Sequence, residues 1–127
     1  MGVTANAVGK PLIMVVDDDA DIRDTLAGLL EDEGYKVVSF PHGREALTAL
    51  EGGLAPRVIL LDLMMPVMDG AEFRRTQLAN PALAPIPVIL ITAAGLEPIK
   101  RSDYSDVLRK PLKVDRVLEV IARYCRG

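Results

Sequence analysis

The sequence is notable first for what it lacks. Its 127 residues contain no tryptophan, only 4% aromatic residues and a single cysteine, so the core must be aliphatic and no internal disulfide can form. A lone thiol, Cys125, suits a reducing compartment, and we expect a cytoplasmic protein. No apolar run approaches the length that spans a bilayer. The formal net charge of −3 argues against binding to nucleic acid or to an anionic membrane surface.

What the sequence does contain is enough apolar residues for one folded domain. Hydrophobic residues make up 50% of the chain, which is too many for a disordered protein. The length is that of one ordinary domain. Residues 1–10 show no apolar pattern, so we expect a flexible N-terminal tail there and a folded domain over residues 11–127.

Short β-rich apolar runs alternate with amphipathic helical patterns along this domain. The expected strands are 11–16, 36–40, 57–61, 86–91 and 106–110, and the expected helices are 20–33, 43–51, 70–79 and 114–125. Strict alternation predicts a parallel sheet with helices on both faces. The segment between the fourth and fifth strands is short and contains Pro98, so we expect a shortened or irregular helix there.

Polar side chains stand where the expected strands end. Asp17 and Asp18 follow the first strand, whereas Asp62, Thr92 and Lys110 follow or end the third, fourth and fifth. The carboxyl ends of parallel strands meet at one edge of a sheet, where such folds bind ligands. Clustered carboxylates repel one another, and Mg²⁺ relieves that repulsion. Ammonium and hydroxyl groups donate to phosphoryl oxygens, so the residues predict a site for Mg²⁺ and a phosphoryl group carried by an aspartate.

Four segments in this order resemble the signature of a known family. They are "LIMVVDDDADIR", "VILLDLMMPVMDG", "ILITAA" and "LRKPL", and they are similar to segments of the two-component response-regulator receiver domain of the single-domain, CheY-like kind. The similarity covers about residues 11–125. It implies a flavodoxin-like, doubly wound five-stranded parallel sheet in the order 2-1-3-4-5, with helices on both faces.

The resemblance also implies a role for each matching acidic residue. Asp62 matches the phosphoacceptor of the family and is also one of its Mg²⁺ ligands. Asp18 matches a direct ligand of Mg²⁺, and Asp17 matches a residue that acts mostly through water. The backbone carbonyl of Met64 would complete the protein ligands. Met64 and Ala94 match the positions that tune dephosphorylation.

Other matching positions imply the residues that respond to phosphorylation. Lys110 would pair with the phosphoryl group, aimed by a cis Lys110–Pro111 peptide bond, and Thr92 would be the hydroxyl that moves in after phosphorylation. The chain departs from the family at Val107, where a tyrosine or phenylalanine is usual, and in the short segment before the fifth strand. Tyr104 is nearby but three residues too early.

Three functions are compatible with these residues. The first is a bacterial signalling switch: a stand-alone receiver that takes a phosphoryl group from a histidine kinase or phosphotransfer protein and acts on a partner protein. Such a protein is not an ordinary enzyme, because it catalyses only its own phosphorylation and dephosphorylation. The second is a receiver-like binding module that no longer switches, which Val107 favours. The third is a phosphohydrolase of the haloacid-dehalogenase type, because Asp17 and Asp19 form an Asp-x-Asp pair.

Overall fold

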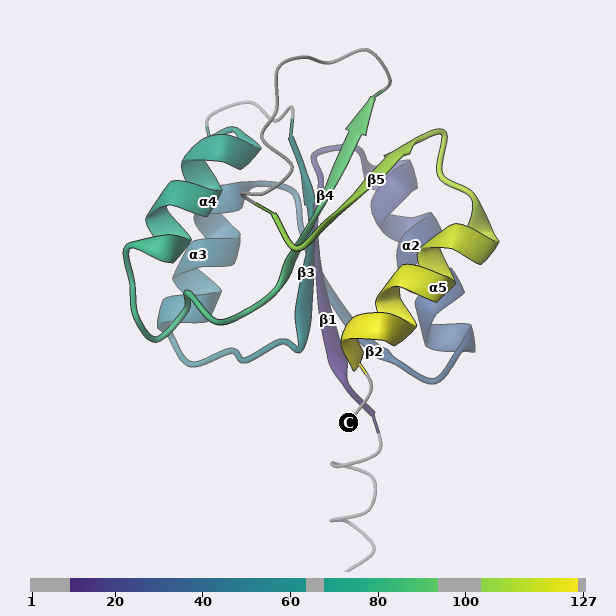
Figure 1. Ribbon diagram of the computed structural model, residues 1–127, viewed down its shortest axis with the longest axis horizontal. Helices are drawn as coiled ribbons and strands as arrows, with labels where there is room; N and C mark the ends of the chain where they lie inside the picture. The colour runs from purple at the N-terminus through teal and green to yellow at the C-terminus, as the bar shows by residue number, and fades with distance from the viewer. Residues whose placement is uncertain (1–9, 64–67, 94–103, 126–127) are drawn as a thin grey trace, which may run out of the picture.

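A five-stranded parallel sheet forms the centre of the molecule (Figure 1). The computed structural model describes residues 10–63, 68–93 and 104–125. The strands are β1 (Leu12–Val16), β2 (Lys36–Phe40), β3 (Val58–Asp62), β4 (Val88–Ala93) and β5 (Asp106–Lys110). Their order is β2-β1-β3-β4-β5, and every neighbouring pair is parallel. The sheet order implied by the resemblance is therefore confirmed.

Helices cover both faces of this sheet, as the alternating pattern predicts. They are α2 (Ala20–Asp32), α3 (Gly43–Glu51), α4 (Gly70–Leu78) and α5 (Val114–Cys125). Figure 1 shows α3 and α4 on one face and α2 and α5 on the other. All four begin and end within one residue of the predicted bounds. No helix in the described part of the chain is both long enough and apolar enough to cross a membrane.

The central strands contribute side chains to two separate hydrophobic clusters. In β1, Ile13 and Val15 belong to the cluster beneath α2 and α5, whereas Met14 and Val16 belong to the cluster beneath α3 and α4. β3 alternates in the same way. Because successive side chains of a strand point to opposite faces, both faces of these strands are buried, which explains their unbroken apolar sequence.

Local signals in the sequence set the helix ends. Asp19 caps α2, because its carboxylate accepts a hydrogen bond from the backbone N–H of Asp21 at 2.9 Å. Asp69 caps α4 by accepting a hydrogen bond from the backbone N–H of Glu72 at 2.9 Å. Gly34 follows α2 with a φ of 95°, a conformation that favours glycine.

Two sequence-based expectations fall mainly outside the described residues. The N-terminal tail covers residues 1–10, of which Lys10 alone is described. The short helix expected between β4 and β5 falls on residues 94–103, which lie outside the described ranges. Both expectations therefore stay predictions.

Candidate functional site

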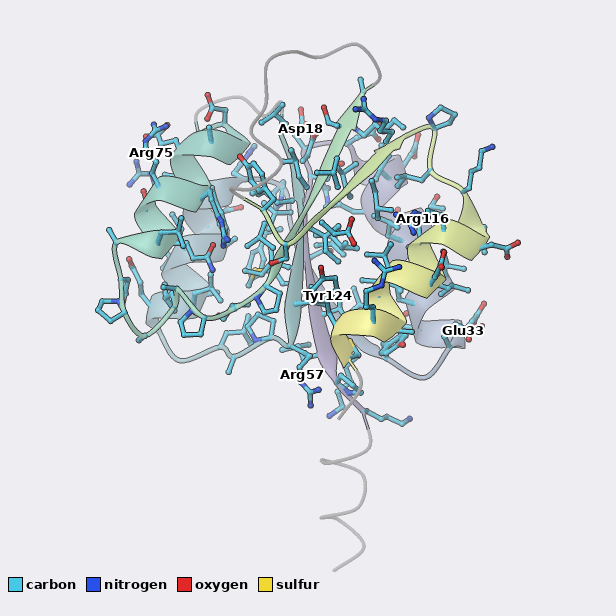
Figure 2. All side chains as sticks on the ribbon, in the orientation of Figure 1. Asp18, Glu33, Arg57, Arg75, Arg116 and Tyr124 are labelled. Atoms are coloured by element: carbon cyan, nitrogen blue, oxygen red, sulfur yellow. The ribbon has the colours of Figure 1, made fainter. Side chains whose placement is uncertain are left out.

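The carboxyl ends of β1, β3 and β5 bring three charged side chains together. Asp17 follows β1 and is fully buried, whereas Asp62 ends β3 and is 4% exposed. Lys110 ends β5, and its side chain is 27% exposed. Figure 2 labels Asp18 near this edge of the sheet. The sequence prediction that these strand ends converge is thus confirmed for the two buried aspartates and the lysine.

Lys110 lies between the two buried carboxylates. Its Nζ is 3.7 Å from Asp17 Oδ2 and 3.7 Å from Asp62 Oδ1. β5 does not neighbour β1 or β3, because β4 lies between β3 and β5, so only a long side chain reaches both acids. Among the described residues, the Lys110 ammonium is thus shared by two carboxylates, and both distances are at the long end of the range for ion pairs. The Lys110–Pro111 peptide bond is cis, as the resemblance implies.

One oxygen of the buried Asp17 carboxylate lacks a hydrogen-bond donor among the described residues. Its Oδ1 accepts a hydrogen bond from the backbone N–H of Asp19 at 2.8 Å, but its buried Oδ2 accepts none from any described residue. Burial raises the pKa of the Asp17 carboxyl, and the Asp19 N–H and the Lys110 ammonium only partly oppose that shift. A buried carboxylate oxygen without a donor is costly, which points to a partner of positive charge.

The donor set fits a small, hard cation. Carboxylate oxygens of Asp17, Asp18 and Asp62 all lie within 4.8 Å of one another. Oxygen ligands from carboxylates are those that Mg²⁺ prefers, and it usually keeps several waters. Asp18 is exposed whereas the other two are buried, so the cluster is open to solvent on one side. Met64, whose carbonyl the resemblance implies as a further ligand, lies outside the described residues.

Two residues brace this edge of the sheet from the helices. Arg23 of α2 donates a hydrogen bond from Nη1 to the carbonyl oxygen of Asp17 at 2.7 Å. Gly70, the first residue of α4, donates its N–H to the carbonyl oxygen of Leu63 at 2.9 Å. A Cβ at position 70 would stand 2.9 Å from the Asp62 carbonyl oxygen. Sequence reasoning assigned neither Gly70 nor Arg23 a role in bracing this edge.

Thr92 and Val107 lie on the neighbouring strands β4 and β5. Thr92 is 1% exposed, and its hydroxyl has a long 3.4 Å contact, as donor, with the carbonyl oxygen of Ala93. Val107 is 5% exposed and pairs with Leu90 across the strands. An aliphatic residue therefore fills a buried position on β5, where the family usually has an aromatic ring.

Some sequence-based interpretations need correction. Asp19 is exposed and caps α2 and is not part of the carboxylate cluster, so the Asp-x-Asp pair does not form a two-carboxylate site. Arg74 of α4 differs from its exposed neighbour Arg75. It is half-buried, donates to Gln77 Oε1 at 2.7 Å and lies over the ring of Tyr104, 6.0 Å from its centroid. The polar contacts of Gln77 and Tyr104 had no signal in the sequence.

The fold and the acidic site define a class of protein. It is a doubly wound α/β protein with a carboxylate cluster and a lysine at the carboxyl ends of its strands. The model of the response regulator receiver domain matches residues 13–122 of this chain. The chain therefore belongs to the response regulator receiver family. Receiver domains take phosphoryl groups from histidine kinases, bind Mg²⁺ at an acidic site and act as signalling modules rather than as enzymes.

Relatives of known sequence differ in length. An uncharacterized 14.6 kDa protein of Leptolyngbya boryana is 38% identical over 117 residues, covering 89% of this chain and 88% of that protein. The C4-dicarboxylate transport transcriptional regulatory protein DctD of Rhizobium meliloti is 34% identical over 119 residues, which cover 89% of this chain but 25% of DctD. The chain thus spans most of the first relative and about a quarter of the second.

Solved structures agree with the fold. Chemotaxis protein CheY4 of Vibrio cholerae is 28% identical and superimposes with a TM-score of 0.81, covering 91% of this chain and 98% of that one. A CheY-like receiver domain protein from Methanospirillum hungatei is also 28% identical, with a TM-score of 0.79 and coverage of 89% and 92%. The chain is similar to both over nearly its whole length.

Proposed function

We propose that the protein is a stand-alone receiver, folded over residues 11–127 and acting in the cytoplasm, which accepts a phosphoryl group on Asp62 from a histidine kinase or phosphotransfer protein. One observation carries the proposal: the Lys110 ammonium lies 3.7 Å from both Asp62 Oδ1 and Asp17 Oδ2. The same three strand ends thus hold an acceptor carboxylate and a cation for the incoming phosphoryl oxygens. The similar length of the Leptolyngbya boryana relative supports the stand-alone form.

The chemistry assigned to Asp62 is in-line phosphoryl transfer. An Asp62 carboxylate oxygen attacks the phosphorus of a phosphohistidine, the P–N bond breaks, and the imidazole leaves with the electron pair. The product is an acyl phosphate on Asp62. Lys110 moves its charge from the two carboxylates to the phosphoryl oxygens, which are stronger partners.

Asp17, Asp18, Asp62 and the carbonyl of Met64 are the residues that would hold Mg²⁺. When bound, Mg²⁺ neutralises the negative charge that gathers on the acids and the phosphoryl oxygens. The open, solvent-facing side of Asp18 leaves room for the waters that Mg²⁺ retains. The buried Oδ2 of Asp17, which accepts no hydrogen bond from the described residues, is the observation that supports a cation here.

The switch is assigned to Thr92. Its hydroxyl makes only a 3.4 Å contact with its own neighbour, which is at the weak limit of hydrogen-bond geometry. A phosphoryl oxygen on Asp62 offers a stronger, charged acceptor. Movement of Thr92 then biases the chain between two states that a partner protein distinguishes.

A non-switching binding module is the second candidate, and Val107 is the observation that favours it. A buried valine cannot rotate a ring into the space that Thr92 leaves, so the family's usual coupling between these positions is missing. In that case the site would accept a phosphoryl group without changing the surface of the molecule.

One experiment separates the two candidates. The protein is incubated with acetyl phosphate with and without Mg²⁺, and both its intact mass and its amide NMR spectrum are recorded. A Mg²⁺-dependent gain of one phosphoryl group, with shifts that reach Thr92 and Val107, supports the switch. A gain with shifts confined to the neighbours of Asp62 supports the binding module. No gain from acetyl phosphate or from a phosphorylated histidine phosphotransfer protein contradicts the proposed phosphoacceptor.

A further inference from the structure

Asp17 begins the short connection between β1 and α2, and the chain binds most of its polar atoms. Its N–H donates to the carbonyl oxygen of Phe40 at 3.1 Å, and its Oδ1 accepts from the Asp19 N–H at 2.8 Å. Its carbonyl oxygen accepts a hydrogen bond from Arg23 Nη1 at 2.7 Å. The remaining polar atom, Oδ2, lies 3.7 Å from Lys110 Nζ. The connection thus directs one carboxylate oxygen of Asp17 into the acidic site.

Arg23 of α2 ties the start of this helix to the end of β1. Its backbone N–H donates to the carbonyl oxygen of Asp19 at 3.1 Å, and its half-buried side chain reaches the carbonyl oxygen of Asp17. A residue has only two soft backbone dihedral angles. Because the peptide groups on both sides of the Asp17 Cα are hydrogen-bonded, both angles are restrained, and the direction of the Asp17 side chain is set.

The hydrogen-bond partner of Arg23 is unexpected for an arginine in this part of the chain. Arg23 is the only basic residue from Asp17 to Asp32, a stretch that also contains Asp21 and Asp24. Yet it forms no ion pair with a carboxylate of the residues that the structure describes. Its guanidinium donates to a backbone carbonyl, although carboxylates are the stronger acceptors. This choice of partner indicates a role in placing Asp17.

The placement of Asp17 matters because its carboxylate belongs to the cluster that would hold Mg²⁺. Oxygens of Asp17, Asp18 and Asp62 lie within 4.8 Å of one another. Mg²⁺ demands near-ideal octahedral geometry at about 2.0–2.1 Å, so it tolerates little displacement of a ligand. Groups that orient metal ligands typically change metal affinity by about 10–100-fold when they are removed.

We propose that Arg23 is a positioning residue of the acidic site, which sets the affinity for Mg²⁺ by holding the Asp17 carbonyl. The inference rests on the proposed function in one respect: it takes Mg²⁺ as the cation of this site. Arg23 has no part in phosphoryl transfer itself and acts through Asp17. Its hydrogen bond keeps the Asp17 carboxylate in the position that the cation requires.

The charge of Arg23 would have the opposite effect on Mg²⁺ from its hydrogen bond. A positive charge near the site repels the cation, so loss of the charge alone would tighten binding. Loss of the hydrogen bond releases the Asp17 carbonyl and weakens binding. The direction of the change in Mg²⁺ affinity therefore separates a positioning role from a purely electrostatic one.

The test is a Mg²⁺ titration of the full, unphosphorylated chain at constant ionic strength, followed by amide NMR. The Asp19 N–H is a direct reporter, because it donates to Asp17 Oδ1 at 2.8 Å. Arg23→Met removes the charge and the donors but keeps an unbranched side chain that favours a helix. We expect Mg²⁺ to bind this variant about tenfold more weakly. Unchanged or tighter binding overturns the inference, as does a wild-type protein that binds no Mg²⁺.

Two further variants serve as controls. Arg75→Met makes the same substitution at an exposed position of α4, on the opposite face of the sheet from α2 (Figure 1), and should leave Mg²⁺ affinity unchanged. Equal weakening in Arg75→Met and Arg23→Met overturns the inference. Arg23→Lys keeps the charge and a donor, so it should bind Mg²⁺ more tightly than Arg23→Met. The reverse order would show that charge repulsion dominates and would overturn the inference.

The Mg²⁺ dependence of phosphorylation gives a second readout. With acetyl phosphate as donor, Arg23→Met should need about tenfold more Mg²⁺ for half of its maximal rate, while its rate at saturating Mg²⁺ stays close to that of the wild type. A rate lowered by the same factor at every Mg²⁺ concentration would show a general structural defect and overturn the inference. Thermal unfolding confirms that each variant is folded at the temperature of the measurement.

Failure of this inference and failure of the proposed function are distinguishable, because the titration needs no phosphoryl donor. If Asp62 of the wild type gains a phosphoryl group and Arg23→Met binds Mg²⁺ normally, Arg23 alone loses its assignment. If Arg23→Met binds Mg²⁺ more weakly and the wild type gains no phosphoryl group from any donor, the phosphoacceptor proposal fails while the role of Arg23 stands.

Discussion

The two ends of the sheet differ in how their polar groups are paired. At the amino ends of β4 and β5, Ser105 donates its backbone N–H to the carbonyl oxygen of Val88 at 2.8 Å, and its Oγ accepts from the Val88 N–H at 3.2 Å. Tyr124 donates its hydroxyl to the Ser105 carbonyl oxygen at 2.6 Å. At the carboxyl ends, Asp17 and Asp62 are buried around one lysine at 3.7 Å.

This difference in pairing indicates that the amino ends stabilise the fold and that the carboxyl ends bind ligands. Hydrogen bonds between neutral groups, together with the Arg123–Asp106 ion pair at 2.9 Å, hold β4, β5 and α5 together at the amino ends, so each of these groups has a partner. The carboxyl ends keep two buried acids that share one lysine, and one of their carboxylate oxygens accepts no hydrogen bond from the described residues. Such an arrangement costs stability, and a cation and a phosphoryl group would supply the missing partners.

The largest effect should follow from removing the shared lysine. Lys110→Ala leaves Asp17 and Asp62 without their cation and removes the partner of the phosphoryl group. We expect the rate of phosphorylation by acetyl phosphate, measured by intact mass, to fall on the order of a hundredfold. Lys113→Ala, an exposed lysine three residues further along, is the control and should keep the wild-type rate. An unchanged phosphorylation rate in Lys110→Ala would show that Lys110 does not take part in the reaction.

The next effect should come from the close approach of α4 to β3. Gly70→Ala places a Cβ 2.9 Å from the Asp62 carbonyl oxygen and 2.9 Å from Leu63 Cα, so the backbone at the phosphoacceptor must shift. We expect a loss of about 1–3 kcal/mol in the free energy of unfolding, measured by urea denaturation, together with slower phosphorylation.

A glycine in open space provides the control for that change. A Cβ at Gly28 of α2 meets nothing within 4 Å. Gly28→Ala should therefore stabilise the protein by about 0.5–1 kcal/mol, since alanine favours a helix. Equal responses of the two glycines would contradict the account of Gly70.

A smaller effect, with a distinctive pH dependence, should follow from Asp17→Asn. Burial raises the pKa of the Asp17 carboxyl in the folded protein, so the folded state retains this proton to higher pH than the unfolded chain. Stability linked to this group is present below the ordinary carboxyl pKa and is lost as pH rises through the raised value. Without divalent cations, Asp17→Asn should unfold at higher temperature than wild type at pH 7, and the gap should close on acidification.

Mg²⁺ should reverse that order. Added Mg²⁺ is expected to raise the unfolding temperature of the wild type, because it binds the folded state, and to raise that of Asp17→Asn much less. An equal rise of the unfolding temperature in both proteins would show that Asp17 does not contribute to Mg²⁺ binding.

The smallest effect should come from the amino ends of the strands. Tyr124→Phe removes the hydroxyl that donates to the Ser105 carbonyl oxygen at 2.6 Å. We expect a loss of about 0.5–1.5 kcal/mol in the free energy of unfolding and no change in phosphorylation. Slower phosphorylation of this variant would contradict the claim that only the carboxyl ends of the strands serve phosphorylation.

The sequence predicted the elements and the strand ends well because both depend on local patterns. β1 is apolar at every position, β3 is apolar at every position before Asp62, and Gly34 and Asp69 mark helix ends by their own chemistry. The family motifs placed Asp62 and Lys110 at strand ends, and the fold brings them together. The predicted roles of these residues, and of Thr92 as the switch, stay predictions.

Side-chain contacts outside the regular spacing of a helix or strand were beyond sequence reasoning. Arg23 braces the Asp17 carbonyl from six residues away, and Arg74 contacts Tyr104 across the fold, yet neither pair has a local pattern that marks it.

The most direct test of the central claim is to locate the phosphoryl group. The protein is phosphorylated in the presence of Mg²⁺, the acyl phosphate is reduced with borohydride to an alcohol, and the modified peptide is sequenced by mass spectrometry. The account predicts a single modified residue, Asp62, and no modification in Asp62→Asn. Modification at Asp17 or Asp18, or an unmodified protein with every donor, would contradict it.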